Sequence, residues 1–185
     1  MSERKELKKI LLIGLDNGGK SSILLSLKND TNLLSFLSLK PTSGLRIQNL
    51  ESSKYDLNIW DFGGQKQYRE DYLKQFHKYT DGIEKVIFVI DVQNIDRYDL
   101  ALDYLKNIVN LLKKDGILVD LKIFLHKYDP NLSKQAGFED IDKIMNERLV
   151  NKITRIIPSE FKYEIYRTSI YAVFEQNLML KSKKK

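Results

Sequence analysis

The sequence predicts an α/β fold, with a mostly parallel six-stranded sheet and helices on both faces. Short runs of consecutive apolar residues, typical of strands buried on both faces, alternate with longer segments in which apolar residues recur at helical spacing. A polar turn separates two of the strand-like runs and predicts a hairpin. We expect the strands at residues 9–13, 45–50, 55–60, 85–90, 118–125 and 163–167.

The helical segments are predicted from their spacing of apolar residues. Between 95 and 114, Leu105, Ile108, Val109 and Leu112 recur three or four residues apart. The other helices are expected at 21–28, at 141–157 and after the last strand, with a charged helical stretch at 72–79. The segment between the first helix and the second strand is polar and is predicted to be a loop.

The length of 185 residues fits one domain covering residues 1–185, with residues 1–7 and 181–185 as flexible tails. The sequence has no cysteine, which excludes disulfides and thiolate zinc sites. It also has no run of 18 apolar residues and a charged start, so we expect neither a transmembrane segment nor a secretion signal, and a cytoplasmic protein.

The net charge of +6 includes a basic tail at Lys181, Lys183, Lys184 and Lys185. Two interpretations of this tail stay open: a solvated chain end, or attraction to an anionic polymer or surface, namely nucleic acid or a lipid membrane. No surface pattern of interleaved aromatic and basic residues is present, so no nucleic-acid partner is expected.

Residues 14–21 match the pattern G-x-x-x-x-G-K-[ST], directly after a predicted strand and before a predicted helix. This pattern forms a phosphate-binding loop, because glycines let successive backbone N–H groups point at phosphate oxygens and the helix adds its positive end. Lys20 is predicted to neutralise the β- and γ-phosphates, and the Ser21 hydroxyl to bind Mg²⁺. The residues expected to contact the phosphates are Asp16, Asn17, Gly18, Gly19, Lys20, Ser21 and Ser22.

Two further segments are expected to complete the phosphate end of the site. Asp61 follows a predicted strand, Gly64 is expected to offer its N–H to the γ-phosphate, and Gln65 is a candidate catalytic residue that orients water. Thr42, in the polar loop, is predicted to bind Mg²⁺ when the γ-phosphate is present.

His126, Lys127 and Asp129 follow another strand and are predicted to bind guanine. A carboxylate can accept from the ring N–H and the exocyclic amine of guanine together, whereas adenine has neither donor. The stem of Lys127 is expected to lie along the base, and the backbone of Ser169 to approach the guanine oxygen. An ATPase or nucleoside kinase with the same phosphate loop is the alternative.

These motifs, in this order, resemble the Ras-like small GTPases over residues 8–180. Residues 14–16, 41–42 and 60–65 are similar to the Arf branch, while 88–92, 126–129 and 167–170 look like the Rag/Gtr branch. The resemblance implies a P-loop NTPase of the small GTPase fold with Mg²⁺ as cofactor, cycling between GTP and GDP as a molecular switch. It also implies effector, activating and exchange proteins as partners, and it leaves open a homodimer or heterodimer with another small GTPase.

The sequence departs from both branches. The ten residues before Leu11 are too few and too charged for the N-terminal amphipathic helix of Arf proteins, and we expect no Rag-type dimerisation domain. Asp16 occupies a loop position where small residues favour an arginine finger, and no arginine precedes Thr42. We therefore expect slow hydrolysis that a partner accelerates by roughly 10³–10⁵. The alternative is a nucleotide-bound scaffold subunit of a Rag-like assembly, with little turnover.

Overall fold

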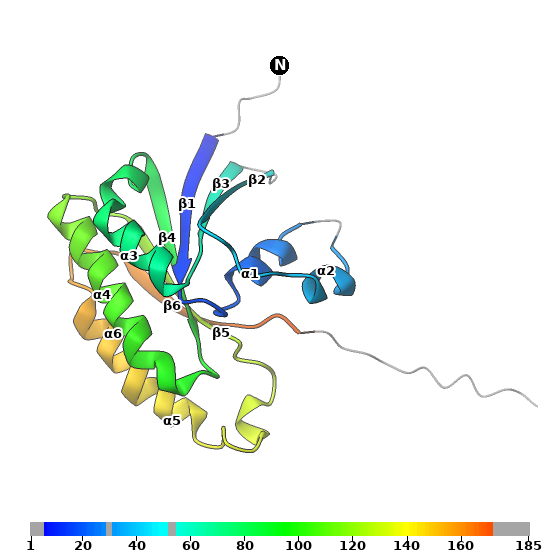
Figure 1. The fold of residues 1–185 in the computed structure, drawn as a ribbon. Helices are drawn as coiled ribbons and strands as arrows, with labels where there is room; N and C mark the ends of the chain where they lie inside the picture. The colour runs from blue at the N-terminus through cyan, green and yellow to red at the C-terminus, as the bar shows by residue number, and fades with distance from the viewer. Residues whose placement is uncertain (1–5, 29–30, 52–54, 172–185) are drawn as a thin grey trace, which may run out of the picture.

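The computed structural model describes residues 6–28, 31–51 and 55–171, and its centre is a six-stranded sheet in the order β2-β3-β1-β4-β5-β6 (Figure 1). The strands are β1 (Glu6–Gly14), β2 (Leu45–Glu51), β3 (Tyr55–Phe62), β4 (Ile83–Asp91), β5 (Asp120–His126) and β6 (Tyr163–Thr168). Only the β2–β3 pair is antiparallel, and the other four pairs are parallel. The predicted mostly parallel sheet and its hairpin are confirmed.

Helices cover both faces of this sheet (Figure 1). They are α1 (Lys20–Ser26), α2 (Leu33–Leu37), α3 (Lys66–Lys74), α4 (Tyr98–Lys114), α5 (Ile141–Met145) and α6 (Asn151–Ile156). α1 lies on one face, and α3, α4, α5 and α6 gather on the other. In the described part of the chain, no helix combines the length and apolarity that crossing a bilayer requires.

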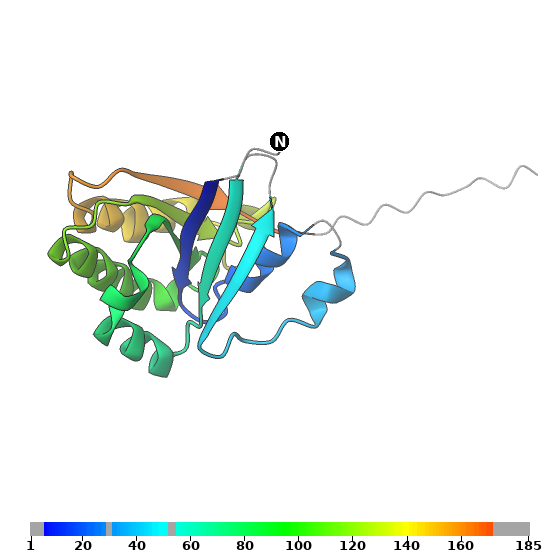
Figure 2. The ribbon, with the colours of Figure 1, turned by 90° about the horizontal axis from the view of Figure 1, so that it is seen from above.

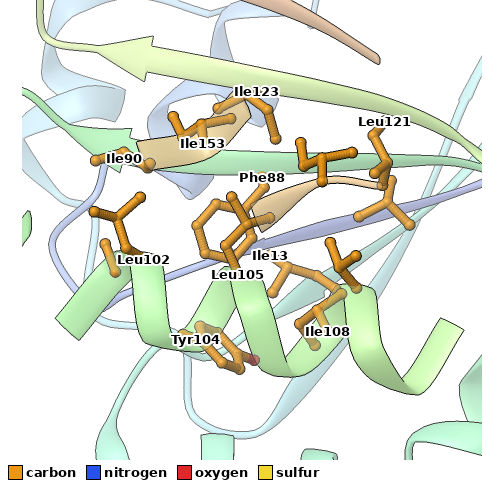
Figure 3. Packing of buried hydrophobic residues seen from close by; sticks show 14 of the residues in the cluster. Ile13, Phe88, Ile90, Leu102, Tyr104, Leu105, Ile108, Leu121, Ile123 and Ile153 are labelled. Atoms are coloured by element: carbon orange, nitrogen blue, oxygen red, sulfur yellow. The ribbon is translucent and has the colours of Figure 1, made fainter. Parts of the chain in front are cut away.

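The larger core lies between the sheet and α4 (Figure 3). Side chains of α4 such as Leu105 and Ile108 pack against Phe88 of β4, and all three are fully buried. Side chains alternate between the two faces along each strand. In β1, Leu11 and Ile13 belong to this larger core, whereas Leu12 between them belongs to a second core with Leu24 of α1. The apolar runs of the central strands are continuous because both of their faces are covered.

The structure differs locally from the prediction in three places. The predicted loop contains the short helix α2, whose N-cap Asn32 accepts a hydrogen bond from the Ser35 N–H at 3.1 Å. α2 stands apart from the sheet and is joined to β2 by an extended segment (Figure 2).

The predicted helix at 141–157 is interrupted by a π-helical turn (Asn146–Val150), and the stretch at 72–79 divides into the end of α3 and a 3₁₀ turn (Phe76–Tyr79). The basic tail and most of the predicted final helix lie outside the described residues.

The carboxyl ends of β1, β3, β4, β5 and β6 meet at one edge of the sheet, since these strands run in the same direction. Ligands of open α/β sheets bind at such an edge. Every nucleotide-binding motif singled out in the sequence lies at this edge, in the last residues of a strand, in a loop, or at the start of the helix that follows it.

Candidate functional site

The loop between β1 and α1 curls around a cavity of about 390 Å³. Gly19 has a left-handed backbone with φ of 88° at the N-cap of α1, and Asn17 has φ of 59°. The cavity brings together most of the residues predicted for the phosphate end of the site. Its lining consists of Asp16, Asn17, Gly18, Gly19, Lys20, Ser21, Ser22, Leu39, Lys40, Pro41, Thr42, Gly64, Gln65 and Lys127.

Lys20 is buried beneath this loop, with 6% of its surface exposed. Its Nζ donates hydrogen bonds to the carbonyl oxygens of Gly14 at 3.1 Å and of Leu15 at 2.8 Å. Burial lowers the pKa of Lys20 to about 8, although the carboxylates of Asp61 and Asp16 oppose this shift. A buried ammonium held only by neutral carbonyls is suited to an anionic ligand that replaces them.

Ser21, Thr42 and Asp61 meet beside the cavity, although they come from α1, the segment before β2, and β3. The two hydroxyl oxygens are 2.9 Å apart, and they donate to Asp61 Oδ2 at 3.0 Å from Ser21 and 3.1 Å from Thr42. Asp61 is fully buried, and its Oδ1 has no hydrogen-bond partner. Burial raises the pKa of Asp61 above its ordinary value, against the opposing effects of Lys20 and the two hydroxyls.

This oxygen cluster fits a hard divalent cation such as Mg²⁺, which prefers oxygen ligands and usually keeps substrate phosphates and waters in its shell. The unpartnered Oδ1 of Asp61 is a buried acceptor that a cation or its bound water would satisfy. Across residues 6–28, 31–51 and 55–171, no group of three or more His, Cys, Asp or Glu side chains could hold a metal by itself. The fit therefore depends on hydroxyls and on ligand phosphates.

Gly64 and Gln65 approach the phosphate loop from the end of β3. A Cβ on Gly64 would lie 2.1 Å from the backbone N of Asp16, so only glycine permits this contact. Gln65 is the N-cap of α3 and lines the cavity. The close contact of Gly64 with the phosphate loop thus places the next residue, Gln65, which is predicted to orient water, at the cavity.

A second cavity, of about 470 Å³, lies beside the first, since Gly19, Ser22 and Lys127 line both. Its other lining residues are Thr31, Asn32, Leu33, Phe36, His126, Asp129, Ile170 and Tyr171. Asp129 lies at the side of the cavity, where its Oδ1 accepts a hydrogen bond from the Ser169 hydroxyl. The structure thus joins Asp129 and Ser169 through a side chain, whereas the sequence predicted a backbone role for Ser169.

His126 lines the second cavity, with 3% of its surface exposed. Its imidazole fills the space that a side chain at Gly19 would occupy, because a Cβ there would lie 2.5 Å from His126 Cδ2. Nδ1 is 2.9 Å from the Thr168 hydroxyl oxygen, and burial lowers the pKa of the ring, which favours neutral histidine. The ring thereby connects the phosphate loop to the end of β6.

Several residues of the site were not predicted from the sequence, among them Arg97, Asp91 and Phe36. Arg97, just before α4, donates to Asp16 Oδ1 at 2.5 Å and to the Asp16 carbonyl oxygen at 3.3 Å. Asp91 accepts from Lys127 Nζ at 2.6 Å, so this lysine is held at its tip. Phe36 lines the second cavity from α2. Asn32 is a typical N-cap residue and could have indicated the helix that carries Phe36. No local signal could have indicated Asp91 or Arg97, because their contacts join positions 36 and 81 residues apart.

Comparison with known proteins identifies the family. The model of the ADP-ribosylation factor family matches residues 1–172. The chain is 34% identical over 157 residues to ADP-ribosylation factor-like protein 2 of Arabidopsis thaliana, covering 80% of this chain and 78% of the relative. It is 36% identical over 140 residues to ADP-ribosylation factor-like protein alp41 of Schizosaccharomyces pombe, covering 75% and 68%.

A solved structure supports the fold. The Arl6 BBS3 small GTPase of Trypanosoma brucei, with a bound nucleotide analogue, superimposes with a TM-score of 0.65 at 20% identity, covering 88% of this chain and 87% of that one. Of the two branches that the motifs resemble, the family model and these relatives identify the Arf branch. The chain therefore belongs to the ADP-ribosylation factor family and is a small GTPase, a molecular switch that hydrolyses GTP to GDP.

Proposed function

We propose that the two adjacent cavities hold the nucleotide, with the triphosphate over residues 16–21 and guanine beside Asp129. The observation that carries the proposal is the meeting of Ser21, Thr42 and Asp61, three oxygen-bearing side chains from distant segments, at one end of the phosphate cavity. These residues would hold Mg²⁺, and the ion would neutralise charge on the phosphate oxygens.

The chain's own groups then support hydrolysis. The Lys20 ammonium exchanges the carbonyl oxygens of Gly14 and Leu15 for phosphate oxygens and neutralises their charge. Gln65 orients a water whose oxygen bonds to the γ-phosphorus, while the bond from that phosphorus to the β–γ bridging oxygen breaks. The bridging oxygen stays with GDP, and the water's protons pass to the released phosphate and solvent.

The switch follows from how Thr42 is held. Thr42 reaches the site from an extended segment, and this segment is connected to β3 through the hydrogen bond from the Gly63 N–H to the Gly44 carbonyl oxygen at 2.9 Å. Loss of the γ-phosphate removes the ligand that favours this arrangement, so the segments around Thr42 and Gly64 change partners together. Effector, activating and exchange proteins would recognise these two segments.

Intrinsic hydrolysis is proposed to be slow. Asp16 places a carboxylate in the phosphate loop, and residues 37–41 supply no arginine to the γ-phosphate. A partner that supplies a cation would raise the rate by roughly 10³–10⁵. The alternative is a Rag-like pairing with a second small GTPase, in which the nucleotide is retained and hardly hydrolysed. The residue that favours this alternative is His126, which resembles the Rag motif. Contact of the basic tail with an anionic membrane surface belongs to the same set of proposals.

Single-turnover hydrolysis of GTP with Mg²⁺, with and without Gln65→Leu, tests this function. We expect the wild type to hydrolyse its bound GTP over minutes to hours. In Gln65→Leu the hydrolysis rate should be lower by roughly tenfold or more, with GDP affinity unchanged. Gln67→Leu is the matched control, because Gln67 is an exposed glutamine two positions along α3. Fast hydrolysis without a partner, or an unchanged rate in Gln65→Leu, would refute the mechanism. Full retention of GTP over a day would favour the scaffold alternative.

A further inference from the structure

The loop that follows β4 reaches across to the loop that follows β5 through one side chain, Gln93. The Gln93 Nε2 donates hydrogen bonds to the Lys127 carbonyl oxygen at 2.8 Å and to Asp129 Oδ2 at 2.9 Å. The backbone N–H of Gln93 donates to Asp91 Oδ1 at 3.0 Å. This side chain, half-buried, is therefore fixed both at its backbone and at its amide.

The chemistry of the contacts sets the orientation of the amide. A glutamine amide has two N–H donors on nitrogen and only acceptor sites on oxygen. Both groups that face it, a carbonyl and a carboxylate, are acceptors. Rotating the amide by half a turn would place its oxygen against both of them, so the donating orientation is the favourable one.

The residue whose carbonyl Gln93 holds has an unusual backbone. Lys127 has φ of 62°, a left-handed conformation that non-glycine residues adopt at a cost of about 1–3 kcal/mol. Gln93 holds its carbonyl, and Asp91 holds its Nζ at 2.6 Å. The last residue of β4 and the loop after it thus stabilise the turn that leads from His126 to Asp129.

The carboxylate of Asp129 receives one donor on each oxygen. Ser169 donates to Oδ1 and Gln93 to Oδ2. Because these donors come from two different loops, they determine the plane of the carboxylate. Each oxygen has a second acceptor site, so each can still accept one N–H from a base in the cavity.

We propose that Gln93 is a positioning residue for guanine recognition. It holds the Asp129 carboxylate in the plane in which its two oxygens face the ring N–H and the exocyclic amine of guanine together. This inference rests on the proposed guanine site at Asp129, and it assigns selectivity for the base to a loop that does not line the base cavity.

Competition binding of GDP and IDP tests the proposal, because IDP carries the same phosphates and lacks only the exocyclic amine. In the wild type, GDP is expected to bind roughly tenfold or more tightly than IDP, the value of one charged hydrogen bond. Gln93→Met keeps the length of the side chain and removes its donors. We expect GDP affinity to fall by about tenfold and the GDP-to-IDP ratio to narrow to within roughly threefold.

Three further variants separate positioning from general damage. Gln135→Met makes the same change at an exposed glutamine that lines neither cavity, and it is expected to leave both affinities unchanged. Gln93→Asn keeps an amide that is one carbon too short to reach both acceptors, and we expect the same narrowing. In an Asp129→Asn background, Gln93→Met is expected to change the GDP-to-IDP ratio no further.

The outcomes are distinguishable. A ratio that narrows in Gln93→Met and Gln93→Asn but not in the Asp129→Asn background supports the proposal. Equal losses for GDP and IDP would make Gln93 merely structural and overturn it. A wild-type protein that does not prefer GDP over IDP and ADP would instead overturn the guanine site at Asp129, on which the proposal depends.

Discussion

The contact between Gly19 and His126 allows a quantitative test of how the phosphate loop is built. Gly19→Ala adds one methyl group where the backbone has φ of 88° and where the new Cβ would lie 2.5 Å from His126 Cδ2 and 2.7 Å from Nε2. The left-handed conformation costs an alanine about 1–2 kcal/mol, and an overpacked methyl group costs a further 1–3 kcal/mol. We therefore expect a loss of about 2–5 kcal/mol in the free energy of unfolding.

The two contributions are separable by a double-mutant cycle. In a His126→Ala background the steric clash is removed and only the backbone cost stays, so Gly19→Ala should then cost about 1–2 kcal/mol. Urea unfolding of the nucleotide-free protein measures all four variants without interference from altered nucleotide affinity. An equal cost of Gly19→Ala in both backgrounds would show that the imidazole does not limit the space at Gly19, and the reasoning would be wrong.

Two further predictions concern charged groups of the phosphate loop. The pKa of Lys20 is lowered to about 8, so between pH 8 and 10.5 the unfolded chain holds a proton that the folded chain has lost. The unfolding free energy of the nucleotide-free wild type should therefore rise with pH relative to that of Lys20→Met. Parallel pH profiles of the two proteins would contradict this. Arg97→Met should lower the unfolding free energy by about 1 kcal/mol at pH 7, a value set by partial exposure of both partners, while Arg155→Met at an exposed position of α6 should not. Burial raises the pKa of Asp16, but Arg97 outweighs this effect and lowers the pKa below 3.8. The stabilisation by the ion pair is therefore present above this value and should disappear as pH falls through the folded pKa. Thermal melting of wild type and Arg97→Met from pH 7 to 3 measures this, and a stability difference between the two proteins that grows on acidification would contradict the assignment.

Much of the fold was predictable because its strands are read from local patterns. The apolar runs of β1 and β4 are visible in the sequence since both faces of these strands are buried. The phosphate loop was equally visible, because its glycines and lysine are adjacent in the chain. Asp61, Thr42 and Ser21 were each singled out, and the structure adds that their oxygens lie within about hydrogen-bonding distance of one another.

What the sequence did not indicate are contacts between loops. Gln93 and Arg97 follow β4 in a segment without a recognisable motif, and each acts on a residue of another loop, Asp129 or Asp16. Polar side chains of this kind are common on surfaces, and nothing in their local spacing distinguishes a supporting contact from solvent exposure. α2 was missed for another reason: it is only five residues long, too short for a periodic signal, and its N-cap Asn32 was read as part of a loop.

The strand order has a consequence for the stability of the protein. The proposed nucleotide cavities are lined by residues from Asp16 to Tyr171, which lie after β1, β3, β5 and β6 and in the segment before β2, so no short fragment of the chain contains the whole site. A ligand that binds only the complete sheet adds its binding free energy to folding, about 4.1 kcal/mol at a concentration 1,000 times its Kd. A guanine nucleotide bound at this site is therefore expected to stabilise the fold itself, and its removal to lower the free energy of unfolding.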